Sequence, residues 1–327
     1  MTAPFDICIV AQAGRVSFEA VLFAASLRAA VPDFPGRLIV GVPKPGPLWP
    51  THPGIEQDTH DLLTWLKADI LPFDSLHFGA AYPYGNKIEL LNAMEPDKPF
   101  LFFDSDTLIT GPLDTLNFDF DRPSASMARE DTWPVEPLYG PDRAAIWEAV
   151  YDRANVPMAP SLDLSFPTGH WERHLYFNAG WFYARCPRVF ADRMLRLMTS
   201  LKKDTPPELA CQSLDPWLDQ IALPVVIAGL GGGRPGPELN GLDGRISLHW
   251  RALPLLYAKA DDATLAFLED ITRPNRIKKV LKQYEPFKRM IYQGRGQKVR
   301  DLFDRDRLPK AERVIRNRIK RAKLWMR

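Results

Sequence analysis

Apolar runs alternate with helix-like periodic stretches over the first 110 residues of the chain. An unbroken apolar run bounded by turn residues is typical of a buried strand, and apolar side chains every three or four positions are typical of an amphipathic helix. The predicted strands are 5–10, 38–42 and 99–103, and the predicted helices are 18–30, 61–67 and 86–94. Strands that alternate with helices indicate an open α/β sheet, in which ligands bind beyond the carboxyl ends of the strands.

The order of elements changes in the second half of the chain. Here the predicted strands are 124–128, 175–185, 224–228 and 246–250, and the predicted helices are 142–152, 188–201 and 215–222. Residues 156–173 are proline-rich and irregular, and the glycine-rich segment 229–241 predicts a mobile loop. Beyond about residue 260 the pattern is helical. We therefore expect a catalytic α/β domain over residues 1–260 and a helical extension over residues 261–327.

The extension is strongly basic although the whole chain has a net charge of only +2. Residues 273–327 contain 20 Lys/Arg and 5 Asp/Glu, a net charge of +15, which leaves about −13 for residues 1–272. Two stretches, 278–292 and 310–327, combine these cations with apolar side chains at helical spacing. Such helices can lie on an anionic membrane surface or pack on an acidic body. Nucleic acid is a disfavoured third partner, because no recognition motif accompanies the charge.

Cysteine content and the first residues bear on where the protein works. The three cysteines, Cys8, Cys186 and Cys211, are far apart and lack metal-ligand spacing, as expected of reduced thiols. The N-terminal sequence MTAPFDICIV has no basic leader, and its apolar run is too short for a signal peptide or a membrane span. We expect a cytoplasmic protein, with a peripheral position at the inner face of the membrane if the basic extension binds lipid.

Two carboxylates, Asp104 and Asp106, directly follow the apolar strand 99–103. Carboxylate oxygens at this spacing can converge on Mg²⁺ or Mn²⁺, which keep open positions for phosphate oxygens. An Asp-x-Asp pair also occurs in solvated turns, but the preceding buried strand favours a site. A haloacid-dehalogenase-type phosphatase is the rival chemistry. It is disfavoured because Thr107 follows Asp106 directly and the pair comes after a hundred residues.

The segment FFDSDTLITGPL resembles the Asp-x-Asp segment of GT-A-fold glycosyltransferases, specifically those related to glycosyltransferase family 8. Further segments agree in order: residues 176–180 (YFNAG) are similar to the Asn-Ala-Gly strand and residues 219–223 (DQIAL) to the Asp-Gln segment. His249 matches the late metal-binding histidine, and Lys87 lies where the family often has a basic residue. The resemblance covers roughly residues 5–257. It implies a GT-A-like mixed sheet flanked by helices, with the basic helical extension added.

The resemblance also implies a role for individual residues. The residues implied to bind a Mn²⁺ or Mg²⁺ ion are Asp104, Asp106 and His249. The residues implied to bind the nucleotide-sugar donor are Ala11, Gln12, Lys87, Asp104, Ser105, Ala179 and Gly180. The residues implied to act at the transferred sugar are Asn178, Asp219 and Gln220. Purely structural roles remain as alternatives: a strand-end Asn178, a water-facing Asp219, a core His249 and a solvated Lys87.

Two departures from the family concern the donor. The chain continues after His249 as WRALPLLYAK, without the Gly-x-Lys-Pro-Trp motif whose lysine binds the diphosphate, so Arg251 and Lys259 are alternative substitutes. The aspartate usual after the first strand is replaced by AQAGR. We expect a metal-dependent, retaining glycosyltransferase that uses a nucleotide-sugar, UDP-linked by preference, and a glycan or lipid-linked acceptor. The alternative is a non-catalytic interaction protein tethered to a membrane by its basic extension.

Overall fold

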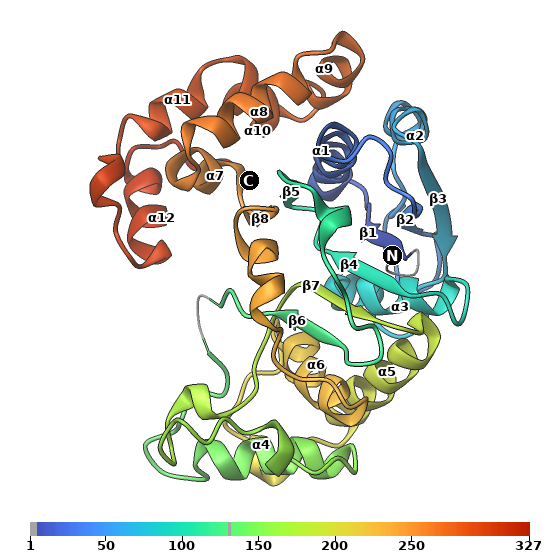
Figure 1. Cartoon of the computed structure of the whole chain (residues 1–327), viewed down its shortest axis with the longest axis vertical. Coiled ribbons are helices and arrows are strands. Elements are labelled where there is room, and N and C mark those ends of the chain that lie inside the picture. The colour runs from blue at the N-terminus through green and yellow to red at the C-terminus, as the bar shows by residue number, and fades with distance from the viewer. Residues whose placement is uncertain (1–4, 130–131) are drawn as a thin grey trace.

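A computed structural model describes residues 5–129 and 132–327 of the chain, so the N-terminal run MTAPFDICIV is described only from Phe5. Figure 1 shows a mixed α/β body and a group of C-terminal helices beside it. The strands are β1 (Asp6–Val10), β2 (Leu38–Pro43), β3 (Ala68–Phe73), β4 (Phe100–Phe103), β5 (Thr107–Ile109), β6 (Ser124–Ser126), β7 (Asn178–Ala184) and β8 (Ser247–His249). The helices of the body are α1 (Arg15–Ala30), α2 (Gln57–Trp65), α3 (Asn86–Ala93), α4 (Arg143–Arg153), α5 (Pro187–Lys203) and α6 (Leu218–Gly229). The C-terminal helices are α7 (Leu253–Lys259), α8 (Asp262–Thr272), α9 (Asn275–Leu281), α10 (Glu285–Phe287), α11 (Arg295–Arg300) and α12 (Glu312–Arg321).

The main sheet has six strands in the order β3-β2-β1-β4-β7-β6. The first four of these are parallel, whereas β7 runs antiparallel to β4 and β6 antiparallel to β7. A second, two-stranded sheet pairs β5 with β8. The predicted mixed sheet flanked by helices is therefore confirmed. The parallel and antiparallel parts of the sheet meet at β4, which pairs with β1 on one side and with β7 on the other.

Two apolar cores lie on opposite faces of the main sheet, because successive side chains of a strand point to opposite faces. In β4, Leu101 and Phe103 belong to the core that includes α1 and α2, and Phe100 and Phe102 to the core that includes α3, α5 and α6. All four side chains are buried. Because a strand that is covered on both faces forms a continuous apolar run, β4 could be predicted from the sequence.

The C-terminal extension shares the first of these cores with the body. Ile315 and Ile319 of α12 are buried in it, together with Phe287 and Met290 from the earlier basic stretch. Both basic stretches thus turn their apolar faces toward the protein. Across the described ranges, no helix is both long and apolar enough to cross a membrane.

Three expectations from the sequence differ from the structure. The strand expected at 224–228 is wrong, because α6 runs through Pro224 to Gly229; an all-apolar run does not distinguish a buried helix from a buried strand. Neither β3 nor β5 was expected: β3 is an edge strand whose middle is partly exposed, and β5 has only three residues. The glycine-rich segment contains a 3₁₀ helix at Pro237–Asp243 rather than loop alone.

Candidate active site

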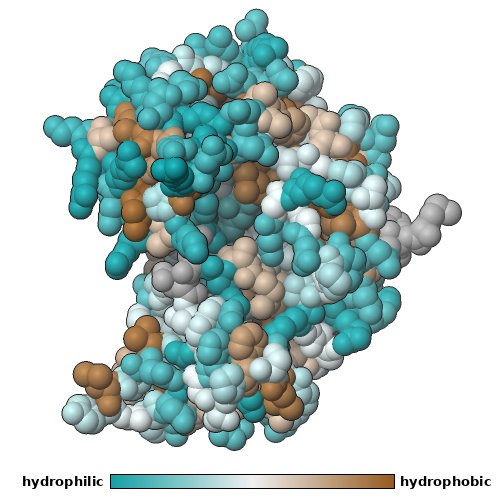
Figure 2. Space-filling model, turned by 60° about the vertical axis from the view of Figure 1, so that its left-hand side comes forward, coloured by the Kyte–Doolittle hydropathy of each residue, from teal (hydrophilic) through white to brown (hydrophobic). Residues whose placement is uncertain are grey.

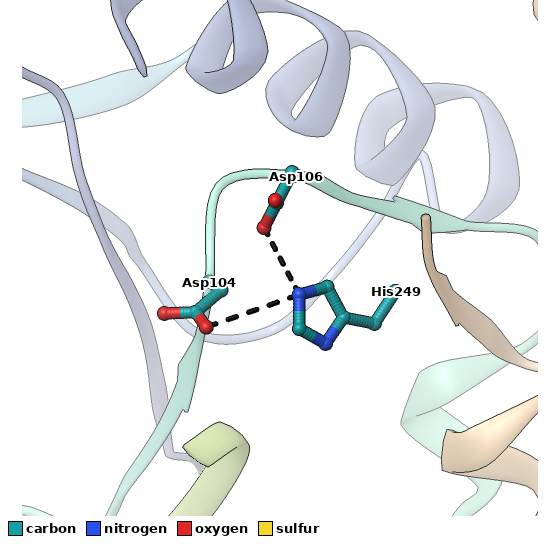
Figure 3. Close-up of side chains that lie close together, drawn as sticks. All are labelled: Asp104, Asp106 and His249. Atoms are coloured by element: carbon teal, nitrogen blue, oxygen red, sulfur yellow. Dashed lines mark ion pairs between the residues drawn. The ribbon is translucent and has the colours of Figure 1, made fainter. Parts of the chain in front are cut away.

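The two carboxylates lie where β4 leaves the main sheet. The N–H of Asp104 donates to the carbonyl oxygen of Gly180 at 2.8 Å, which ties the end of β4 to β7. The chain then turns through Ser105, whose hydroxyl donates to the carbonyl oxygen of Val10, and enters β5 after Asp106. Beyond the turn, one carboxylate oxygen of each aspartate pairs with the ring of His249 (Figure 3).

His249 completes a three-residue cluster with the two carboxylates. Strand β8 pairs with β5 so that His249 lies opposite Thr107, next to Asp106. Its Nε2 atom is 3.1 Å from Asp106 Oδ1 and 3.9 Å from Asp104 Oδ2 (Figure 3). One ligand atom from each of the three residues lies within 4.8 Å of the others. Two carboxylates and one imidazole fit a divalent cation and leave coordination positions open for a ligand.

Gly180 leaves the space that the His249 ring occupies. A Cβ atom on Gly180 would lie 2.4 Å from His249 Nδ1 and 2.9 Å from Asn178 Oδ1. Contacts under 3 Å do not occur for real Cβ atoms, so any side chain at Gly180 would displace the ring. The Asn178 side chain also accepts the N–H of Gly180 at 2.8 Å. Asn178 therefore has the strand-end role weighed from the sequence, while it also lines the cleft.

The charges around the cluster differ between the two aspartates. Burial raises the pKa of Asp104, and the nearby Lys87 and His249 only partly oppose this effect. Burial also acts to raise the pKa of Asp106, but the His249 ring, with smaller contributions from Arg15 and Arg327, holds it below its usual value. Asp106 is thus the more strongly ionised of the two carboxylates.

Lys87 links the cluster to α6 through a buried ion-pair network. Its Nζ atom is 2.9 Å from Asp104 Oδ1 and 3.1 Å from Asp219 Oδ2. The Tyr82 hydroxyl donates to Asp219 Oδ1 at 2.8 Å. Burial acts to lower the pKa of Lys87, but the two carboxylates outweigh it and raise the pKa, so the ammonium is charged. The alternatives of a solvated Lys87 and a water-facing Asp219 are wrong, since both residues are buried.

Two glutamine side chains at the cleft are oriented by neighbours. Gln220 Oε1 accepts a hydrogen bond from the Tyr176 hydroxyl at 3.0 Å. Gln12 Oε1 accepts one from Asn86 Nδ2 at 2.8 Å. Because each amide uses its oxygen in this way, the NH₂ group of each glutamine is directed toward other acceptors.

These side chains converge on one cleft of about 590 Å³. The face in Figure 2 is hollowed near its middle, below the mainly hydrophilic surface of the C-terminal helices. Of the twelve residues predicted from the sequence, those that line the cleft are Gln12, Lys87, Asp104, Ser105, Asp106, Asn178, Ala179, Asp219, Gln220 and His249. Ala11 does not line it: its side chain is fully buried, and its N–H donates to the carbonyl oxygen of Gly41. Gly180 supports the wall from behind, next to His249.

The sequence did not predict that α12 and the residues after it also line this cleft. Glu312, Arg316, Trp325 and Arg327 belong to the same lining as Asp104, Asp106 and His249. Arg251 and Lys259, the alternative diphosphate-binding cations, both pair with the buried Glu312, at 3.0 and 3.2 Å. The amphipathic pattern and charge of residues 310–327 were visible in the sequence, but neither specifies a packing partner.

A family model described as "Rhodobacterales glycosyltransferase domain" matches residues 7–231. The chain belongs to the Rhodobacterales glycosyltransferase domain family. It is therefore an enzyme that transfers sugars, and the alternative of a non-catalytic interaction protein is not favoured.

Among solved structures, this glycosyltransferase is similar to the galactosyltransferase LgtC in complex with donor and acceptor sugar analogs, at 16% identity and a TM-score of 0.41. That match covers 71% of this chain and 73% of LgtC. It is also similar to apo GlyE from Streptococcus pneumoniae TIGR4, at 12% identity and a TM-score of 0.40, over 84% of this chain and 54% of GlyE. Apo WbbM, a bifunctional glycosyltransferase, matches at 13% identity and a TM-score of 0.39, over 83% and 44% of the two chains. No curated protein matches the sequence.

Proposed function

We propose that this glycosyltransferase uses a nucleotide-diphosphate sugar and a Mn²⁺ or Mg²⁺ ion held by Asp104, Asp106 and His249. A UDP-linked sugar is the first candidate for the donor. The observation that supports the proposal is the convergence of three ligand atoms within 4.8 Å in the wall of a cleft of about 590 Å³. This volume is in the range of small-molecule sites. A divalent ion bound there would supply Lewis-acid stabilisation of the negative charge that develops on the leaving diphosphate.

We further propose that the remaining side chains divide between donor and sugar. Gln12, Ser105, Lys87 and Ala179 would lie on the donor side of the cleft, with Ala11 and Gly180 supporting the backbone behind them. Asn178, Asp219 and Gln220 would lie beside the transferred sugar. Of these, Gln220 is the better candidate for direct contact, because Asp219 already pairs with Lys87 and Tyr82. Retention of the anomeric configuration would agree with these roles, and an inverted product in an NMR assay would refute them.

A thermal-shift experiment tests the metal and donor together. The protein is melted with Mn²⁺ plus UDP, GDP or CDP, each with and without a sugar. A nucleotide at about 100 times its dissociation constant adds about 2.7 kcal/mol. With an unfolding entropy of about 2.1 cal/mol/K per residue, this raises the melting temperature of the 327-residue chain by roughly 4 °C. Asp104→Asn and Asp106→Asn should abolish the metal-dependent shift, and the exposed Asp114→Asn should retain it. If no nucleotide shifts the wild-type protein, the donor proposal is wrong.

The acceptor is proposed to be a glycan or a lipid-linked glycan reached from the cytoplasm. Because Ile315 and Ile319 are buried against the body, membrane contact through α12 would depend on its exposed cations, at about 1 kcal/mol each near an anionic surface. Co-sedimentation with phosphatidylserine vesicles should then weaken steeply with salt. Binding that persists at 1 M salt would contradict this electrostatic mode, and no binding at low salt would contradict membrane association.

A further inference from the structure

The last sixteen residues comprise α12 (Glu312–Arg321) and six further residues, through which the chain turns back toward the cleft. The carbonyl oxygen of Ile319 accepts the N–H of Leu324 at 3.1 Å, and Lys323 adopts a left-handed conformation with φ of 57°. This is the hydrogen-bond pattern of a Schellman-type helix end, which reverses the chain direction. The reversal brings Trp325 and Arg327 to the wall of the cleft that also contains His249. We call residues 312–327 the C-terminal arm.

A buried carboxylate anchors the arm beside the metal cluster. Glu312 is 5% exposed and accepts ion pairs from Arg251 and Lys259, which follow His249 in the chain. Arg251 adopts φ of 58°, a conformation that is uncommon for residues other than glycine and that redirects the chain after β8. The chain segment after the metal-binding histidine therefore holds the arm in place.

The arm presents two arginines to the cleft. Arg316, one helical turn after Glu312, pairs with it at 2.8 Å, and its guanidinium lies 5.5 Å from the centre of the Trp325 ring. A guanidinium stacked on an indole is fixed in orientation and keeps donors for another acceptor. Arg327, the last residue of the arm, lines the same cleft as Glu19, Asp106 and His249.

Six Lys/Arg side chains and five carboxylates line the cleft, so a bound divalent ion would leave a clear excess of positive charge there. Lys87 is matched by Asp104 and Asp219, and Arg15 by Glu19. A divalent ion at Asp104, Asp106 and His249 would add two further positive charges. The arm then adds positive charge at the site where the proposed donor brings the negative charge of its diphosphate. Arginine is the side chain best suited to this contact, because its planar donors match phosphate oxygens.

We propose that the C-terminal arm is a wall of the donor site, in which Arg316 and Arg327 bind the diphosphate of the donor and Trp325 holds Arg316 in position. The inference rests on the proposed function, since it assigns residues to the same donor. In this proposal the arm binds the phosphates of the donor and does not contact its nucleoside. Loss of a charge-assisted hydrogen bond typically weakens binding about tenfold or more.

The test compares diphosphate and nucleoside binding in full-length variants. Calorimetric titrations with Mn²⁺ would use UDP, GDP and CDP and the corresponding nucleosides. Arg327→Gln and Arg316→Gln should each weaken diphosphate binding about tenfold and leave nucleoside binding unchanged, while Arg327→Lys, which keeps the charge, should recover part of the loss. Arg321→Gln is the matched control, because Arg321 is exposed on the same helix and outside the cleft lining. Its affinity should stay within about twofold of the wild type.

The outcomes separate this inference from the proposed function. Diphosphate binding by Arg327→Gln and Arg316→Gln at wild-type affinity would overturn the role of the arm and leave the donor proposal standing. Equal weakening of nucleoside and diphosphate would also overturn it, because the arm would then only stabilise the cleft. Failure of the wild-type protein to bind any of the three diphosphates with Mn²⁺ would instead overturn the donor proposal itself. Arg327→Gln is the decisive variant, because its exposed side chain can be changed without disturbing the core.

Discussion

Replacement of Lys87 by methionine would show how strongly the cleft depends on its buried ion pairs. Methionine keeps the apolar stem of the side chain but removes the ammonium that contacts Asp104 and Asp219. Breaking a buried pair costs about 3–5 kcal/mol, because a charge is left without a partner. The Asp104 side chain is 28% exposed and can regain water, whereas that of Asp219 is 4% exposed and cannot. We therefore expect the lower end of the range, about 3 kcal/mol.

The assay is thermal unfolding at constant pH in the presence of a chelator. With an unfolding entropy of about 2.1 cal/mol/K per residue, a loss of about 3 kcal/mol lowers the melting temperature of the 327-residue chain by roughly 4 °C. The matched control is Lys44→Met. Lys44 pairs with Asp74 at the shorter distance of 2.7 Å, but the two side chains are 46% and 60% exposed, so the loss should stay below about 1 kcal/mol.

A double variant checks the cause of the instability. Adding Asp219→Asn to Lys87→Met removes the orphaned charge while the side-chain oxygen still accepts from Tyr82, so part of the stability should return. The reasoning is refuted if Lys87→Met is no less stable than Lys44→Met. It is also refuted if the double variant is less stable than the sum of its two single variants predicts.

Three further outcomes are expected. Gly180→Ala should weaken Mn²⁺ binding in a titration at least tenfold, because its Cβ would displace His249, whereas Gly233→Ala, with open space around its Cβ, should bind as the wild type does. Burial is the main reason that the pKa of His174 lies below its ordinary value. As the pH drops below about 6.5, this histidine is therefore protonated in the unfolded state before it is protonated in the folded state, and the free energy of unfolding should fall. His174→Gln should flatten this fall in melting curves from pH 7.5 to 5.5, and equal slopes would contradict the argument. Burial acts to raise the pKa of Glu312, but the cationic side chains around this carboxylate outweigh burial and lower its pKa. The ionised Glu312 therefore stabilises the fold fully above about pH 4.5, and this stabilisation is lost at lower pH. The melting temperature of Glu312→Gln should thus be lower than that of the wild type at pH 7, by an amount that corresponds to about 2 kcal/mol, and the gap should close in acid.

The sequence predicted the part of the site that follows from local pattern. A strand buried on both faces is a continuous apolar run, so the position of Asp104 at its end could be read directly from residues 99–103. Asn178 and His249 were reached through the family resemblance, and pairing of β4 with β7 and of β5 with β8 brings them to the same place. Strand pairing between distant segments leaves no trace in the periodicity of either segment.

Elements with mixed or uniform patterns were misassigned for physical reasons. Residues 218–229 are almost all apolar, so neither helical nor strand periodicity was visible, and Pro224 suggested a break that the helix does not make. Strand β3 is covered mainly at its two ends, which gives an edge strand no clear alternation. The amphipathic basic helix in the arm was predicted, but the surface on which it packs was not. Its ion pairs join Glu312 to Arg251 and Lys259, which are too far away in the sequence for a local pattern to reveal.

Two cations of the basic extension lie at the same cleft as the carboxylates of the acidic body. The body supplies the carboxylates at the sheet end, where a metal ion would be held, and the extension supplies Arg316 and Arg327 to the lining of the same cleft. A metal ion and a diphosphate require opposite charges within a few ångströms of each other. Placing those charges on separate elements lets each be held by its own buried partners, Lys87 on one side and Glu312 on the other. Because the apolar face of α12 packs on the body, only the exposed cations of the extension are left to contact a membrane surface.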